Sequence, residues 1–301
     1  MKSRLKIGVV GAGVFGGYHA NKCAAHPRTE FIGIFDPDLA RAKAGAKTHD
    51  VTAFEKYEDM LVSVDAVVIA CPARYHGQMA ITALRAGKHC LIEKPIASTL
   101  HEAETIVSLA DQNGCVVQVG HQERFVAKAI GLDTILETPA ALTAARLGTF
   151  SERGTDVSVT LDLMTHDIDL VHMLMGKPSN RVSGESLCVK SDQPDAARAV
   201  LHYGATKARL QASRVEDGFT RVMTITYPSG ILEIDFNAKT LRHNTPFNLN
   251  ADFGNDPAAH DSLGAATHSF IESVLDGREV AVSAHDGLNA LRAALIIDGN
   301  I

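Results

Sequence analysis

The sequence predicts an α/β protein in which a doubly wound parallel sheet is followed by an α+β domain with an open, mostly antiparallel sheet. Short apolar runs alternate with helical stretches through the first 120 residues, a pattern typical of parallel strands joined by helices. After Gly120 the sequence pattern changes, and turn-forming sequences recur about every ten residues. We therefore expect two domains, residues 1–120 and residues 121–301.

The first domain is expected to alternate strands and helices. Its first apolar run, residues 5–10, is short and contains β-branched residues, which favours a buried parallel strand. Right-handed crossovers between such strands place helices on both faces of the sheet. The expected strands are residues 5–10, 30–35, 50–53, 65–70, 89–93 and 115–119. The expected helices are residues 14–25, 38–47, 75–86 and 100–113.

The second domain is expected to contain an antiparallel meander with one face on helices and one face open. Residues 139–148 alternate weakly between apolar and polar, and turn signals follow at 203–204, 216–218 and 227–230. We expect the open face to be buried in a homodimer or homotetramer. Helices are expected at residues 158–175, 261–276 and 285–297, and a long loop at 237–260.

Composition excludes several classes of function. The formal net charge of −6 argues against a nucleic-acid-binding surface. We expect no membrane association, because no apolar stretch is long enough to span a bilayer and the first apolar run is too brief for a signal peptide. Scattered cysteines indicate reduced thiols in a cytoplasmic protein, with neither a disulfide framework nor a metal site. They are Cys23, Cys71, Cys90, Cys115 and Cys188.

A glycine pattern, Gly11-x-Gly13-x-x-Gly16, joins the first expected strand to the first expected helix. Gly11 permits a tight turn, Gly13 lets a pyrophosphate approach the backbone, and Gly16 lets the helix pack on the strand. The amides of Val14 and Phe15, at the start of that helix, then face the phosphates. In this setting the pattern predicts a Rossmann dinucleotide-binding site, with an ordinary glycine-rich turn as the alternative.

Asp36 bears on the choice between NAD and NADP. It ends the second apolar run, twenty residues after Gly16. A carboxylate there accepts hydrogen bonds from the ribose hydroxyls of adenosine and repels a 2′-phosphate. We therefore expect NAD, with NADP as the less favoured cofactor because Arg41 follows nearby.

A second group of chemical residues is Asp162-x-x-x-His166, inside the expected helix 158–175. Four residues apart on a helix, the carboxylate and the imidazole share a face, so Asp162 can orient His166 and raise its basicity. Asp169 is a further possible support for His166. The alternatives are solvated charges on a helix surface and a metal site. The metal site is disfavoured because the sequence offers no clear third ligand nearby.

The segment Glu93-Lys94-Pro95 follows an expected strand at its carboxyl end, where open α/β sheets bind ligands, and we expect Glu93 and Lys94 to contact the cofactor. An ammonium held there can hydrogen-bond a substrate hydroxyl and stabilise negative charge that develops on its oxygen. Proline makes a cis bond after Lys94 possible. Cys71-Pro72 ends another strand, and we expect it, Tyr75 and His76 near a nicotinamide. Packing at a helix start explains Tyr75 and His76 equally well.

Gly11-Ala-Gly-Val-Phe-Gly16, Glu93-Lys94-Pro95 and Asp162-x-x-x-His166 occur together in this order. In this the chain resembles, over nearly its whole length, the glucose–fructose oxidoreductase, inositol dehydrogenase and rhizopine-catabolism family (Gfo/Idh/MocA). The resemblance implies NAD(P)-dependent oxidation or reduction of sugars, cyclitols and related polyols. It also implies that Lys94 and His166 are the catalytic pair, that His166 exchanges a proton with the reacting hydroxyl, and that Asp162 binds or orients at the site.

A narrower resemblance is to family members that oxidise UDP-N-acetylglucosamine at carbon 3. It is carried by Gly120-His-Gln-Glu-Arg-Phe125, by Arg146-Leu-Gly-Thr-Phe150 and by the stretch from Asp162 to Asp169. Val126 stands where an Asn often follows Arg-Phe in related members, and the chain has no Trp that would stack on uridine.

The expected function is hydride transfer between a nicotinamide cofactor and a hydroxyl of a sugar or nucleotide sugar. Three alternatives are an inositol or other polyol dehydrogenase, a hydrolase or lyase that uses NAD transiently, and a non-catalytic dinucleotide sensor. Retention of Lys94, Asp162 and His166 favours an enzyme, because a sensor has no need of all three.

Overall fold

The structure is a computed structural model that describes residues 4–152 and 154–301. Its first sheet consists of parallel strands. The six strands lie in the order β3-β2-β1-β4-β5-β6, with β1 between β2 and β4. The chain moves outward from β1 first in one direction and then in the other, which confirms the predicted doubly wound sheet. The strands are β1 Leu5–Val10, β2 Thr29–Phe35, β3 Thr52–Phe54, β4 Ala66–Ile69, β5 His89–Ile92 and β6 Val117–Val119.

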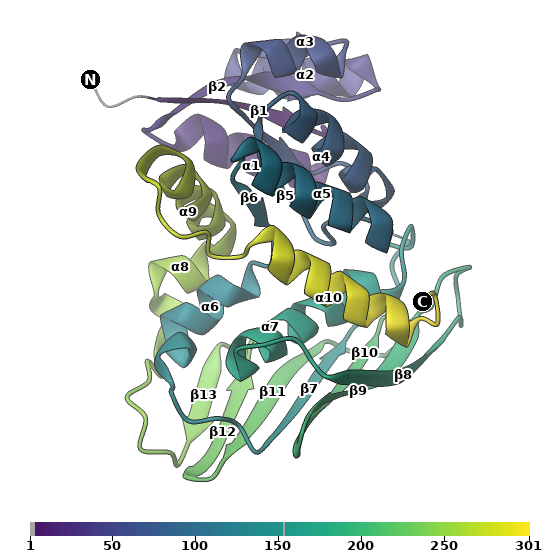
Figure 1. The fold of residues 1–301 in the computed structure, drawn as a ribbon, viewed down its shortest axis with the longest axis vertical. Coiled ribbons are helices and arrows are strands. Elements are labelled where there is room, and N and C mark those ends of the chain that lie inside the picture. The colour runs from purple at the N-terminus through teal and green to yellow at the C-terminus, as the bar shows by residue number, and fades with distance from the viewer. Residues whose placement is uncertain (1–3, 153) are drawn as a thin grey trace. The chain divides into compact units, whose positions relative to one another are not determined.

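Helices connect these strands, and most begin or end within a few residues of the expected positions (Figure 1). Helix α2 runs to His49 and ends where Asp50 adopts a left-handed conformation with φ 53°, so β3 starts at Thr52. Helix α5 is capped by Thr99, whose hydroxyl accepts a hydrogen bond from the Glu102 amide. The helices are α1 Val14–Ala25, α2 Leu39–His49, α3 Tyr57–Ser63, α4 His76–Arg85 after a 3₁₀ turn at Ala73–Tyr75, and α5 Leu100–Asn113. Helix α3 was not expected.

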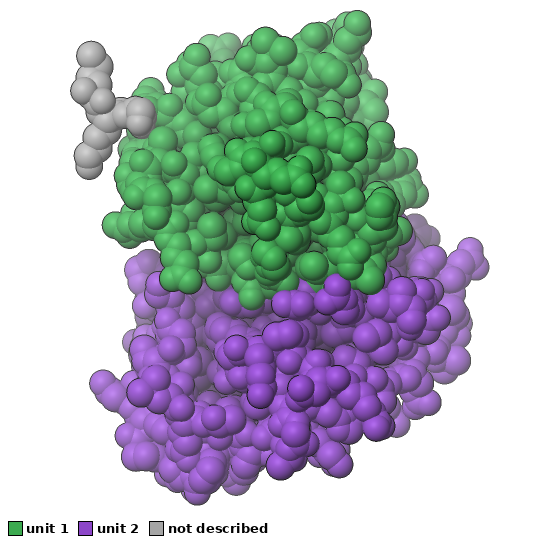
Figure 2. Space-filling model, viewed as in Figure 1, with its two compact units in different colours: residues 1–120, 263–288 green, residues 121–262, 289–301 purple. Residues whose placement is uncertain are grey.

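Helix α9 (Ser262–Asp276), late in the sequence, packs into the core of the first sheet. Phe270 and Ile271 are fully buried in one apolar cluster with Ile7, Val9 and Val68 of the strands. The chain accordingly forms two compact units, one of residues up to 120 with 263–288, the other of 121–262 with 289–301 (Figure 2). Each unit therefore contains two separate segments of the chain.

The second unit contains a seven-stranded sheet in the order β13-β12-β11-β7-β10-β9-β8. Strand β7 lies in the middle, parallel to β10 and antiparallel to β11. The predicted mostly antiparallel sheet is therefore confirmed, but it consists of two three-stranded meanders joined through β7. The strands are β7 Ala141–Leu147, β8 Arg181–Leu187, β9 Ala196–Tyr203, β10 Thr206–Ser213, β11 Thr220–Tyr227, β12 Gly230–Asp235 and β13 Thr240–His243.

One face of this sheet is buried and the other is open. Along β7 and β11 the side chains alternate, so that Leu142, Ala144, Met223 and Ile225 are buried. Helix α7 (Thr165–Met175) lies over the buried face, as Figure 1 shows. The remaining helices are α6 Glu123–Ile130, α8 Pro257–His260 and α10 Ala284–Ile297, with 3₁₀ turns at Leu132–Thr134 and Phe253–Asn255.

Two expectations for this unit were wrong in detail. The helix expected at 158–175 begins with a π-helical turn, Thr160–Met164, before α7, because the Thr165 amide donates to the Thr160 carbonyl five residues back. The loop expected at 237–260 contains β13 and the short helix α8. Throughout residues 4–152 and 154–301, none of the helices has the length and apolar content needed to cross a membrane.

Candidate functional site

The glycine turn after β1 has one position that protein packing does not explain. Gly11 has φ +103°, and a Cβ there would lie 2.8 Å from the Ala70 carbonyl oxygen. A Cβ on Gly16 would collide with the Gly11 carbonyl oxygen. A Cβ on Gly13, in contrast, would meet no atom within 4 Å from the described part of the chain beyond its sequence neighbours and the start of its own helix. The backbone at Gly13 is thus open to an outside group, as close approach of a pyrophosphate requires.

The start of α1 next to this turn is suited to an anion. No side chain caps the helix at Gly13, and its first turn contains no acidic residue. Val14 and Phe15 expose 54% and 39% of their surface, so the start of the helix is accessible. Backbone amides and the positive end of the helix dipole favour phosphate at such a position. These features fit a dinucleotide.

Asp36 is held against the glycine turn by backbone hydrogen bonds. Its Oδ2 accepts from the Ala12 amide at 2.8 Å, and its Oδ1 accepts from the Asp38 amide at 2.9 Å. Arg41 is engaged on the surface, where its Nε lies 3.3 Å from Asp38 Oδ2. The end of β2 therefore presents a fixed carboxylate beside the glycine turn, and the nearby arginine is already paired.

His76 connects two strand-end corners of the first sheet. Its Nδ1 lies 2.7 Å from the Pro95 carbonyl oxygen, and its Nε2 lies 2.9 Å from the Cys71 carbonyl oxygen. The contacts fit the interpretation of His76 as a packing residue at a helix start. The Lys94–Pro95 bond is cis.

Glu93 is buried directly before Lys94. Its Oε1 lies 2.8 Å from His19 Nε2, and its Oε2 accepts from the Lys94 amide at 3.3 Å. Burial raises the pKa of Glu93, but the hydrogen bond from His19 and the charges of His19 and Lys94 outweigh it, so the net pKa is lowered. Gly120 is packed on this carboxylate, since a Cβ there would lie 2.9 Å from Glu93 Oε2. The segment that carries Lys94 is therefore anchored on an ionised, buried glutamate.

In the second unit Asp162 and His166 are both half-buried. Asp162 lies in the π-helical turn, so the regular four-residue helical spacing does not describe its relation to His166. The His166 ring meets the edge of His121, with ring centroids 6.0 Å apart. Gly154, with φ +84°, lies against Asp162: a Cβ there would be 2.7 Å from Asp162 Oδ2. The polar groups around Asp162 and His166 thus come from three separate segments of the second unit.

Two neighbouring carboxylates on α7 bind arginines. Asp169 accepts two hydrogen bonds from Arg124, at 2.8 and 2.7 Å, so its expected role as a support for His166 is wrong. Asp167 accepts two from Arg146, at 3.2 and 3.0 Å. Burial raises the pKa of Asp167 above its ordinary value even though Arg146 acts in the opposite direction. These ion pairs fix α7 against α6 and β7, and with them the backbone that carries His166.

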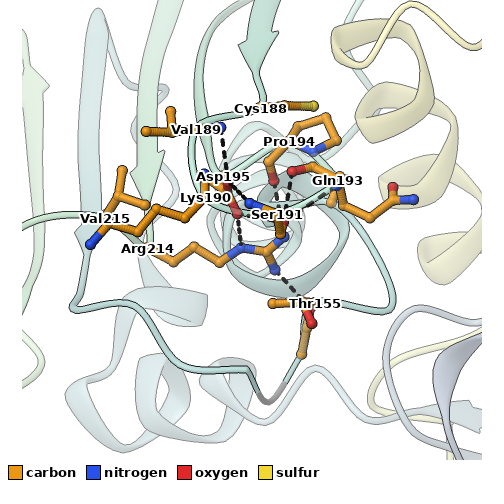
Figure 3. A network of polar contacts seen from close by, with 12 residues as sticks. Thr155, Cys188, Val189, Lys190, Ser191, Gln193, Pro194, Asp195, Arg214 and Val215 are labelled. Carbon is orange, nitrogen blue, oxygen red and sulfur yellow. Dashed lines mark hydrogen bonds and ion pairs between the residues drawn. The ribbon is translucent and has the colours of Figure 1, made fainter.

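A polar network around Asp195 and Arg214 (Figure 3) holds the segment that contains Gly154. The fully buried Asp195 accepts hydrogen bonds from the amides of residues 189–191 and from Arg214 Nε at 2.8 Å. Arg214 Nη1 donates to the Gly154 carbonyl at 2.7 Å. Arg214 Nη2 also donates to the carbonyls of Val157 and Pro194. The position of Gly154 against Asp162 therefore depends on two buried residues that no sequence motif marks.

The structure thus brings the expected cofactor residues of the first unit together at the carboxyl ends of its strands, and Asp162 and His166 at one end of α7. Sequence reasoning did not identify His19, His121, Gly154 or the Arg214–Asp195 pair. Of these, only His121 lay in a segment that carried a resemblance. His19 is 74 residues from Glu93, and Arg214 is 60 residues from Gly154, so no local pattern marks these contacts.

The chain resembles known oxidoreductases over both of its units. Residues 5–121 match the model of an oxidoreductase family with an NAD-binding Rossmann fold. The chain is 33% identical to UDP-N-acetylglucosamine 3-dehydrogenase from Acidithiobacillus ferrooxidans, over 97% of this chain and 95% of that protein. A crystal form of that organism's enzyme GnnA superposes with a TM-score of 0.89 at 32% identity, covering 99% of this chain and 98% of that one. Inositol 2-dehydrogenase from Corynebacterium glutamicum (strain R) is 31% identical over 72% of this chain and 66% of that protein.

Proposed function

The chain belongs to the Gfo/Idh/MocA family of oxidoreductases, and from this premise we propose that it oxidises UDP-N-acetylglucosamine at carbon 3 with NAD. A dehydrogenase that acts on CH–OH groups with a nicotinamide cofactor follows from the family itself. The observation that carries the substrate is the 33% identity to a UDP-N-acetylglucosamine 3-dehydrogenase, because it extends over 97% of this chain and so includes both units.

NAD is the proposed cofactor because of the groups around the glycine turn. The open backbone at Gly13 and the uncapped start of α1 would hold the pyrophosphate. Asp36 would accept hydrogen bonds from the adenosine ribose, and its charge would repel the 2′-phosphate of NADP. In the structure Arg41 pairs with Asp38 on the surface, and Asp36 is the charge that is fixed beside the glycine turn.

The chemistry requires a proton acceptor and a group that stabilises the reacting oxygen. A cofactor held at the glycine turn and Asp36 would supply the acceptor for the hydride that leaves the carbon. We assign the hydroxyl proton to His166, and the hydrogen bond to the hydroxyl oxygen to the ammonium of Lys94. The buried Glu93, which is bonded to His19 and to the Lys94 amide, anchors the segment that carries this ammonium. Asp162 would bind the sugar or orient His166.

Inositol oxidation is the second candidate, because an inositol 2-dehydrogenase is nearly as similar over 72% of the chain. The two candidates differ in the nucleotide, which inositol lacks.

We further propose that a second copy covers the open face of the seven-stranded sheet. The five cysteines are free thiols, which suits a reducing compartment such as the cytoplasm.

A substrate screen tests the proposal. UDP-sugars, free aldoses and inositols are each incubated with NAD or NADP, and formation of reduced cofactor is followed by absorbance. We expect the highest kcat/KM for UDP-N-acetylglucosamine with NAD, and a product that is oxidised at carbon 3. A higher kcat/KM for an inositol than for UDP-N-acetylglucosamine would refute the proposal and support inositol oxidation instead. The Lys94→Ala variant is the control for contaminating dehydrogenases.

A further inference from the structure

A small cavity of about 110 Å³ in the second unit lies where β7 ends and β11 begins. The π-helical turn that carries Asp162 also borders this cavity, through Leu163. The polar and aromatic lining consists of Arg146, Thr149, Ser151, Arg214, Phe219 and Arg221. Three arginines and two hydroxyl residues around one cavity suit an anion.

Two of these arginines stand directly opposite each other. Arg146 of β7 pairs with Arg221 of β11 in the antiparallel register, and both continue the series of side chains on the helix-covered face. Like charges at directly opposed positions destabilise a sheet. Such a pair is therefore expected only where each charge is compensated by a neighbour, by water or by a ligand.

Arg146 and Arg214 are compensated within the protein. Arg146 binds Asp167 and also Glu123, whose Oε1 lies 3.0 Å from Arg146 Nη1. Arg214 binds Asp195. No group in the described ranges 4–152 and 154–301 lies within hydrogen-bond or ion-pair distance of the Arg221 guanidinium. Arg221 is itself exposed to solvent, and partial desolvation and then the charge of Arg146 lower its pKa, while Glu123, Asp167 and Asp162 act in the opposite direction. Because the Arg221 guanidinium has no protein partner within the described ranges and is exposed, an anion can contact it and compensate its charge.

An exposed aromatic ring lies beside these charges. Phe219 exposes 70% of its surface, and its ring atoms lie 3.3 Å from the position that a Cβ on Gly148 would take. The ring is thus backed by the Gly148 backbone, and much of it remains accessible. Aromatic rings exposed next to cationic groups are a common platform for stacking a nucleobase.

We propose that Arg221 and Phe219 bind the nucleotide end of the substrate, a nucleoside diphosphate. Arg221 pairs with the diphosphate, the hydroxyls of Thr149 and Ser151 assist it, and the base stacks on Phe219. Because the π-helical turn borders this cavity and carries Asp162, the sugar attached to the diphosphate extends towards Asp162. This inference rests on the proposed function in so far as the substrate carries a nucleotide.

The test uses UDP itself as the probe, so that binding is measured without turnover. Titration calorimetry compares the wild type with Arg221→Gln, Phe219→Ala and Arg242→Gln, an exposed arginine of β13 that serves as the matched control. We expect Arg221→Gln to weaken UDP about tenfold or more, as loss of a charge-assisted hydrogen bond predicts. Phe219→Ala should weaken UDP several-fold while inorganic pyrophosphate is affected less, because only UDP carries a base. The control should bind as the wild type does, and thermal melts verify that all variants are folded.

The outcomes separate this inference from the proposed function. If UDP binding depends on Arg221 but UDP-N-acetylglucosamine is not oxidised, the nucleotide site stands and the carbon-3 assignment fails. In an active enzyme, Arg221→Gln should raise KM for the UDP-sugar about tenfold and change kcat little. Unchanged UDP affinity and unchanged KM in Arg221→Gln would overturn the inference, whatever the enzyme oxidises.

Discussion

Replacing Asp195 by Asn should destabilise the protein strongly, because one carboxylate organises a buried network. Asp195 Oδ2 accepts three backbone hydrogen bonds, at 2.9, 2.6 and 2.9 Å. Oδ1 accepts from the Ser191 hydroxyl and from Arg214 Nε, both at 2.8 Å. An amide keeps only one of these two oxygens, so its NH₂ group must face either the backbone donors or Arg214.

The size of the expected loss of stability follows from the buried groups that Asp195→Asn leaves without a partner. Arg214 is 4% exposed, and its own counter-charge would be gone, although it would keep its bonds to backbone carbonyls. Breaking a buried ion pair at one partner typically costs about 3–5 kcal/mol. We expect about 3 kcal/mol for Asp195→Asn, because those carbonyl bonds remain. A loss of this size is a large fraction of the roughly 5–15 kcal/mol that stabilises a typical protein.

The effect should depend on pH in a defined direction. Burial raises the pKa of Asp195, but the bonds from Arg214 and from the backbone amides outweigh it, so the folded-state pKa is lowered. A lowered folded-state pKa means that the stabilisation is complete above the unfolded-state value of about 3.9 and is lost as pH falls below it. The difference between wild type and Asp195→Asn should thus be constant near neutrality and shrink in acid.

Urea unfolding at several pH values, followed by circular dichroism, measures this difference. Asp192→Asn is the matched control, since Asp192 is exposed on the same turn and should change stability by less than about 0.5 kcal/mol. If Asp195→Asn unfolds at the wild-type urea concentration, or if the difference grows in acid, the network does not stabilise the fold in the way described.

Three further predictions concern catalysis and cofactor choice. Lys94→Ala should lower kcat about a hundredfold or more and leave the Kd for NAD nearly unchanged; near-normal turnover would remove Lys94 from the catalytic role. His166→Ala should lower kcat strongly and Asp162→Asn less, and in the wild type oxidation should slow in acid because a base that already carries a proton accepts none. Persistence of the same acid limb in His166→Ala would point to another base. Asp36→Ala should narrow the preference for NAD over NADP in fluorescence titrations, and equal binding of both cofactors by the wild type would contradict the assignment.

The first sheet could be predicted from sequence because its signals are local. A strand, a glycine turn and a helix follow one another within residues 5–25, and each can be recognised without knowing the rest of the fold. Helix α3 escaped prediction because it is only seven residues long and no side chain caps its start at Lys56. Short, uncapped helices depend on tertiary packing and leave little pattern in the sequence.

The second unit was harder to predict because its arrangement depends on distant contacts. Nothing in residues 139–148 indicates that β7 would lie between two meanders and parallel to β10, which is more than fifty residues later. The π-helical turn has the composition of an ordinary helix start, and only its hydrogen bonds distinguish it. The motif residues Asp162 and His166 could be found, but their neighbours Gly154 and His121 required the fold.

The position of α9 has a consequence for synthesis on the ribosome. Residues up to 120 leave the ribosome first, but their sheet completes its apolar cluster only with Phe270 and Ile271 of α9. At usual elongation rates the nascent sheet waits roughly ten to thirty seconds for that helix. During this interval the side chains that later pack on α9 are exposed to other nascent chains and to chaperones. In a fragment that stops at residue 120, the side chains that pack on α9 would remain exposed. Cofactor binding is therefore better studied on the whole chain than on its first 120 residues.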